Sequence, residues 1–88
     1  QLIKDFTLIN SSVSIGHNVE IGSFCNINPG VNLAGNIKIG SRTFIGIGSS
    51  IKENIIIGSN VMIGAGSVVI NDIPDGALAY GVPAKIIS

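Results

Sequence analysis

Residues 15–68 divide into nine blocks of six residues: IGHNVE, IGSFCN, INPGVN, LAGNIK, IGSRTF, IGIGSS, IKENII, IGSNVM and IGAGSV. Every block begins with Ile or Leu, and the same spacing extends outward to Ile3 and to Val69. Four residues after each of these aliphatic residues stands a small or β-branched residue, for example Val19 or Cys25. Residues four apart lie on the same side of an extended chain, so each block predicts two inward side chains.

The period of six residues excludes an α-helix, which needs a period of 3.6 and would not carry so many glycines. Glycine directly follows the aliphatic residue in most blocks, as at Gly16 and Gly22. Glycine tolerates the positive φ of a tight corner, and the recurring Asn residues tolerate it better than most. We therefore predict an all-β solenoid in which short strands are joined by regular corners.

The pattern of an aliphatic residue, Gly, two variable positions and a small or β-branched residue resembles the hexapeptide-repeat proteins. The resemblance extends in register from Ile3 to Pro74. It implies a left-handed parallel β-helix of about four coils, with three blocks in each triangular coil of eighteen residues. The implied coils are Ile3–Glu20, Ile21–Lys38, Ile39–Ile56 and Ile57–Pro74. The predicted organisation is a β-helix acyltransferase domain over 1–76, followed by a short C-terminal cap over 77–88.

The composition of the 88 residues limits the expected partners. The formal net charge is zero and 11% of residues are charged, so we expect neither nucleic acid nor a membrane as a partner. A chain of this length buries too little surface to be very stable alone, which favours an oligomer. The lone Cys25 occupies an inward position, where we expect a structural role, and a free thiol fits a cytoplasmic location. Because the chain begins inside the repeat at Gln1, we expect a preceding region in the full protein.

Positions eighteen residues apart are expected to lie directly above one another in successive coils. His17 then lies below Gly35, and Gly35 lies below Glu53. The other predicted columns are Asn10, Asn28 and Gly46; Pro29, Ile47 and Ala65; and Ser11, Ser23, Ser41 and Ser59.

His17 is the only histidine, and it occupies an outward position of its block. It is either a solvated surface residue or a general base that takes a proton from a hydroxyl or an amine. Gly35, one coil above, leaves open space and an exposed backbone N–H beside it. Acyl transfer requires a base next to the nucleophile and a donor for the developing oxyanion, so we predict His17 and Gly35 as catalytic residues.

Four segments of the sequence are similar to hexapeptide-repeat sugar acetyltransferases that modify sialic acids and UDP-linked amino sugars: NSSVSIGHNVEIGSF, PGVNLAGN, FIGIGSSI and IGAGSVVINDIPDGALAYGVPAKII. The resemblance implies acetyl-CoA as co-substrate, a sugar or nucleotide-sugar acceptor, and a homotrimer with its active site between neighbouring subunits. It assigns His17 as the base and the Gly35 N–H to the thioester carbonyl. It assigns Asn26, Ile47 and Ala65, together with Gly35, to acetyl-CoA.

The chain departs from this family at two positions. Where members often have an acidic residue beside the base, this sequence has Asn18, which is expected to orient the imidazole by hydrogen bonding. Where members often have a second histidine, it has Asn26. A zinc enzyme of the γ-class carbonic anhydrase type needs three histidines, so one histidine excludes it and no metal is predicted. A non-catalytic, oligomerising β-helix module remains the alternative function.

Overall fold

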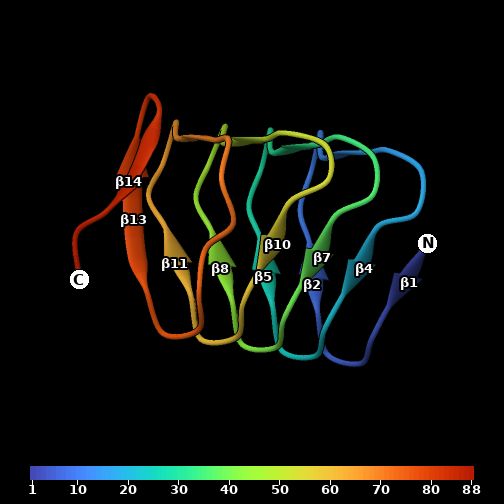
Figure 1. The fold of residues 1–88 in the computed structure, drawn as a ribbon. Helices are drawn as coiled ribbons and strands as arrows, with labels where there is room; N and C mark the ends of the chain where they lie inside the picture. Colours follow the sequence, from blue (N-terminus) through green and yellow to red (C-terminus); the bar gives the residue numbers. More distant parts are fainter.

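The computed structural model describes residues 1–88, the whole chain, and contains only strands and turns. Twelve strands of two residues recur at intervals of six residues, and the coils that they form are stacked side by side (Figure 1). These strands are β1 (Leu2–Ile3), β2 (Leu8–Ile9), β3 (Ser14–Ile15), β4 (Glu20–Ile21), β5 (Asn26–Ile27), β6 (Asn32–Leu33), β7 (Lys38–Ile39), β8 (Phe44–Ile45), β9 (Ser50–Ile51), β10 (Ile56–Ile57), β11 (Met62–Ile63) and β12 (Val68–Val69).

Every third strand belongs to the same sheet, so the solenoid has three faces. Sheet A contains β1, β4, β7 and β10; sheet B contains β2, β5, β8 and β11; sheet C contains β3, β6, β9 and β12. The strands within each face are parallel, and paired residues are eighteen apart, as in Ile3 with Ile21 and Glu20 with Lys38. The predicted left-handed parallel β-helix of about four coils is therefore confirmed.

After Gly76 the chain forms the strands β13 (Leu78–Gly81) and β14 (Ala84–Ile86). β13 continues sheet B in parallel with β11, and β14 pairs with β13 in the antiparallel direction. This hairpin closes the C-terminal end of the solenoid (Figure 1). The structure contains no helix with the length and hydropathy needed to span a membrane.

The two inward residues of each block form the core. Aliphatic residues such as Ile27 and Ile45 are completely buried, and each contributes about 1.5–3 kcal/mol relative to an exposed position. Cys25 is buried as predicted, and its Sγ donates to the Gly40 carbonyl over 2.9 Å. Ile3 in the first coil is 41% exposed, because no coil covers that end of the core.

The repeated glycines have a different role from the one predicted. Positive φ occurs at the fourth residue of the block, as at Asn18, Asn36 and Gly48, whereas Gly16 and Gly22 do not adopt it. A Cβ on Gly16 would lie 2.8 Å from the Ala34 carbonyl carbon in the next coil. The prediction that these glycines supply the corner conformation is therefore wrong, because they are required by the close approach of the stacked coils.

The three corners of the solenoid carry different side chains at the third position of the block. The serine corner lies between sheets A and B and contains Ser23, Ser41 and Ser59. The glycine corner lies between sheets B and C and contains Ile47, Ala65 and the positive-φ residues Gly30, Gly48 and Gly66. The histidine corner lies between sheets C and A and contains His17, Gly35 and Glu53.

One predicted column is wrong at its first member. Ser11 lies in the glycine corner, where its carbonyl accepts the Gly30 N–H over 3.1 Å. Asp5 occupies the place below Ser23, and its carbonyl accepts the Phe24 N–H over 3.2 Å. The reason is the coil length: Ser11 precedes Ser23 by twelve residues, which is two thirds of a turn.

Candidate active site

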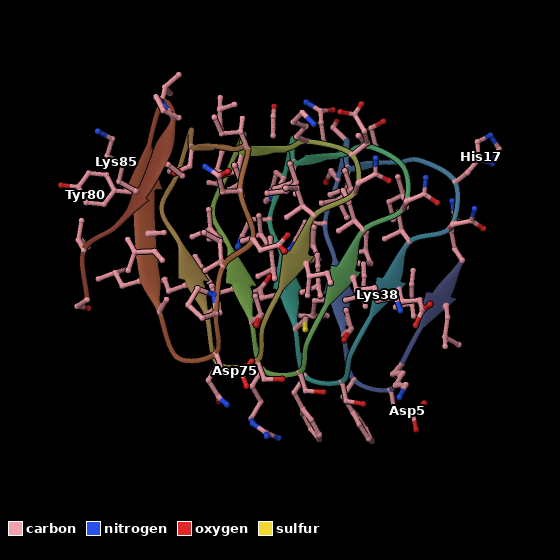
Figure 2. The ribbon with its side chains drawn as sticks, viewed as in Figure 1. Asp5, His17, Lys38, Asp75, Tyr80 and Lys85 are labelled. Carbon is pink, nitrogen blue, oxygen red and sulfur yellow. The ribbon has the colours of Figure 1, made fainter.

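The histidine corner holds His17 and Gly35 in consecutive coils. The Asn36 N–H donates to the His17 carbonyl over 2.8 Å, and the Asn54 N–H donates to the Gly35 carbonyl over 3.1 Å. These bonds place Gly35 directly above His17, as the spacing predicted. The His17 side chain is exposed and projects outward near the N-terminal end of the solenoid (Figure 2).

The Gly35 N–H donates to no acceptor within the chain. In the serine corner the equivalent groups do have acceptors, because the N–H groups of Ser23 and Ser41 donate to the Oγ atoms of Ser41 and Ser59 over 3.0 and 2.9 Å. The N–H at this corner position is thus directed at the next coil, where only a side chain can accept it. Above Gly35 that side chain belongs to Glu53.

Glu53 does not accept the Gly35 N–H, since its γ atom is a carbon where serine has an oxygen. In the serine corner, Gly22 makes room for the Ser41 hydroxyl, since a Cβ on Gly22 would lie 2.6 Å from that Oγ. The corresponding residue below Glu53 is Ala34, which carries a Cβ where Gly22 has none. The Glu53 carboxylate instead pairs with Lys52 Nζ over 3.1 Å. The Gly35 N–H therefore remains free for a ligand.

The predicted orienting role of Asn18 is not what the structure shows. Asn18 Nδ2 donates to Asn36 Oδ1 over 3.2 Å, and the amide lies along the corner rather than against His17. The His17 imidazole forms no hydrogen bond and no ion pair within the chain. Its orientation is therefore left to a ligand or to a neighbouring molecule.

Ile47 and Ala65 form an exposed column in the glycine corner, and the Gly66 N–H donates to the Ile47 carbonyl over 2.8 Å. The N–H groups of Ile47 and Ala65 have no acceptor within the chain. A Cβ on Gly48 or on Gly66 would meet nothing within 4 Å. This corner is an open edge with free backbone donors.

Asn26 lies on β5 and faces outward from sheet B, in register with Leu8 and Phe44. Its Oδ1 accepts a hydrogen bond from Asn10 Nδ2 over 3.0 Å, while its own Nδ2 has no partner. Asn26 is therefore a fixed, half-buried amide donor in an otherwise apolar row of the sheet.

The predicted site residues form two separate groups in one chain. His17 and Gly35 lie at the corner between sheets C and A, whereas Ile47 and Ala65 lie at the corner between sheets B and C. Sheet C separates the two corners. No group of three or more His, Cys, Asp or Glu side chains is close enough together to hold a metal ion.

Sequence reasoning missed the contribution of Asn36. Its N–H binds the His17 carbonyl and its side chain accepts from Asn18, so it joins the two coils of the histidine corner. A signal was present in the sequence, because Asn18, Asn36 and Asn54 are spaced by eighteen residues. All three adopt positive φ.

Comparison with known proteins shows which proteins the chain is similar to. Residues 36–71 match the family described as bacterial transferase hexapeptide (six repeats). The resemblance to hexapeptide-repeat sugar acetyltransferases that the sequence indicated is confirmed by this match and by solved structures. No curated protein sequence matches the chain.

Three solved structures illustrate the similarity. PerB from Caulobacter crescentus, in complex with CoA and GDP-perosamine, is 38% identical with a TM-score of 0.93, over 94% of this chain and 40% of that protein. The acetyltransferase domain of PglB from Neisseria gonorrhoeae FA1090 is 38% identical with a TM-score of 0.95, over 97% of this chain and 42% of that one.

The third is the serine acetyltransferase CysE from Neisseria gonorrhoeae in complex with serine, which is 38% identical with a TM-score of 0.87, over 97% of this chain and 38% of that one. The chain therefore spans about two fifths of the length of these relatives. The molecules bound in these structures differ, since PerB holds the nucleotide-sugar GDP-perosamine and CysE holds the amino acid serine.

Proposed function

We propose that this chain is the acetyl-CoA-binding part of an acetyltransferase that modifies an amine or hydroxyl of a sugar or nucleotide-sugar. The observation that carries the proposal is the free Gly35 N–H held one coil above His17. A base and an unoccupied backbone donor in neighbouring coils of one corner are the two groups that acyl transfer requires. The similarity to the PglB acetyltransferase domain supports the reaction, and the similarity to PerB, whose structure holds CoA and GDP-perosamine, supports the class of acceptor.

The reaction is a direct transfer. The His17 imidazole takes a proton from the acceptor amine or hydroxyl, which attacks the thioester carbonyl carbon of acetyl-CoA. The carbonyl oxygen becomes an oxyanion, and the Gly35 N–H donates a hydrogen bond to it. The tetrahedral intermediate then collapses: the C–S bond breaks, and the CoA thiolate takes the proton from the imidazolium.

Acetyl-CoA would lie along the glycine corner. The free N–H groups of Ile47 and Ala65 are donors for the amide carbonyls of its pantetheine arm, and the open space at Gly48 and Gly66 allows close approach. The Asn26 amide on sheet B is a donor for the acetyl group. The structure of the PglB acetyltransferase domain with acetyl coenzyme A supports this choice of co-substrate.

The separation of the two corners requires a second copy of the chain. A complete site forms when the histidine corner of one subunit faces the glycine corner of the next, and a closed three-fold ring repeats this contact around its axis. A trimer would also add buried surface to a chain that is small for an independent domain.

The replacement His17→Ala tests the base. We expect acetyl-CoA-dependent thiol release, measured with a panel of amino sugars and nucleotide-sugars that includes GDP-perosamine, to fall by about 10²–10⁴-fold. Because the side chain is exposed, the folded state should be retained, which the thermal melting curve checks. Thiol release equal to that of the parent would remove His17 from the mechanism.

Subunit mixing tests the shared site. Chains carrying His17→Ala and chains carrying Ala65→Trp should each be inactive, but trimers reassembled from equal amounts should recover about a quarter of the parent activity. Recovery is expected because some sites then combine an intact His17 with an intact Ala65. Mixtures that stay inactive would place both corners of the site within one chain.

One observation favours the alternative of a non-catalytic oligomerising module. Asn18 is bound to Asn36, so nothing in the chain orients the His17 imidazole. The two functions differ in one measurement: a non-catalytic module would form the trimer but would release no thiol from acetyl-CoA with any acceptor.

A further inference from the structure

A groove of about 320 Å³ lies on sheet A beside the serine corner. Its lining includes Glu20 and Lys38, which face outward from β4 and β7, and the serine-corner residues Ser41, Ser59 and Asp75. None of the lining residues belongs to the histidine corner. In Figure 2 His17 and Asp75 lie at opposite edges of the solenoid, with Lys38 between them.

Ser41 and Ser59 both line this groove, and each has a hydroxyl hydrogen without an acceptor in the chain. The Oγ atoms of Ser41 and Ser59 each accept a backbone N–H from the coil below, which fixes the position of each oxygen. Neither hydroxyl donates to an acceptor within the chain. Two half-buried O–H donors with fixed oxygens are thus available to a ligand.

Among the charged residues of the groove, Asp75 accepts the Ser59 N–H, whereas the Glu20 and Lys38 side chains form no hydrogen bond or ion pair within the chain. Glu20 and Lys38 are nevertheless directly paired in the register of β4 and β7. Lys4 and Asp75 also line the groove, so two positive and two negative side chains surround it. A phosphate or a carboxylate would therefore meet as much repulsion as attraction.

This balance of donors and acceptors fits a ligand whose groups both donate and accept hydrogen bonds. Sugar hydroxyls do both, and the volume is at the lower end of the range of about 300–1,000 Å³ for small-molecule sites. Leu2 and Ile56 at the two ends of the row supply apolar contact for ring carbons. We propose that this groove binds one neutral sugar ring, with Glu20 accepting and Lys38 donating hydrogen bonds to its hydroxyls.

The proposed sugar site is separate from acyl transfer at His17 and does not depend on it. The test uses the full chain labelled with ¹⁵N and titrated with N-acetylglucosamine, methyl mannoside and galactose in turn. We expect at least one of them to bind with a millimolar Kd and to shift the amide signals of Gly22, Gly40, Ser41 and Ser59. The replacements Glu20→Gln and Lys38→Met should each weaken that binding about tenfold.

Matched controls are the replacements Glu53→Gln and Lys52→Met, which make the same chemical changes at the exposed histidine corner. They should leave the Kd unchanged. The proposal is overturned if none of the three sugars shifts these amides, if the controls weaken binding as much as the groove variants, or if inorganic phosphate shifts the same amides at lower concentration than the sugars.

Discussion

The serine corner and the histidine corner have the same backbone but use it differently. In the serine corner each outward N–H donates to a side-chain oxygen in the coil above, and the series ends where the Ser59 N–H donates to Asp75 Oδ1 over 2.7 Å. In the histidine corner Gly35 has no side chain to accept from His17, and Glu53 is turned toward Lys52. One corner satisfies its donors internally, whereas the other leaves them available.

The two corners also differ one position earlier in the block. Gly22 and Gly40 make room for the serine hydroxyls above them, whereas the residue below Glu53 is Ala34, which carries a Cβ. The side chain at position 53 has a carbon rather than an oxygen at the γ position, so the Gly35 N–H has no acceptor there.

Among the tests of this comparison, the largest effect is expected from rebuilding the serine arrangement in the histidine corner. In the double variant Ala34→Gly/Glu53→Ser, the new hydroxyl should accept the Gly35 N–H, as Ser59 accepts that of Ser41. Acetyl transfer should fall by about 10²–10³-fold, because the proposed oxyanion donor is then occupied. The assay is acetyl-CoA-dependent thiol release.

Two controls separate this effect from damage to the fold. Ala34→Gly/Glu53→Ala opens the same room but adds no oxygen, and Glu53→Ser alone leaves the Ala34 methyl group in place. Both should keep most of the activity. If they lose as much as the double variant with serine, the free N–H is not the oxyanion donor.

A smaller effect, on stability, is expected from Gly40→Ala. The added Cβ would lie 2.6 Å from the Ser59 nitrogen and 2.7 Å from the Gly58 carbonyl carbon, so the coils must separate locally. The free energy of unfolding, measured by urea denaturation, should fall by about 1–3 kcal/mol. In the matched change Gly35→Ala the added Cβ would lie 3.3 Å from the His17 carbonyl oxygen, its nearest neighbour. The free energy of unfolding should then fall by less than about 1 kcal/mol. Equal losses would contradict the steric account of these glycines.

The smallest expected effect is that of Ser41→Ala. This change removes the acceptor of the Ser23 N–H and should lower the free energy of unfolding by about 1 kcal/mol. The control is Ser14→Ala, an exposed serine on sheet C whose hydroxyl has no partner in the chain. A loss at Ser14 as large as at Ser41 would show that the serine series does not stabilise its corner.

Much of the fold could be predicted because it depends on a local period. The residues Ile21, Ile27 and Ile45 follow a spacing of six, and all of them are buried. The stacking of Gly35 above His17 was also predictable, since it needs only a constant coil length. The error at Ser11 shows how strictly this length applies, because a spacing of twelve residues leads to another corner.

The role of the repeated glycines could not be predicted in the same way. Conformational freedom and lack of a side chain are both properties of glycine, and a single sequence does not separate them. At Gly16 the absence of a Cβ matters, whereas at Gly48 the positive φ matters. The distinction depends on the distance between neighbouring coils.

The period of the sequence was sufficient for the strands, the coil length and the vertical order of His17 and Gly35, because each follows from a repeat within the chain. Three-dimensional packing decided which N–H groups remain free and where Asn18 and Glu53 direct their side chains. These features depend on contacts between side chains of different coils. Such contacts are set by a few tenths of an ångström of steric room, which a period of six residues does not encode.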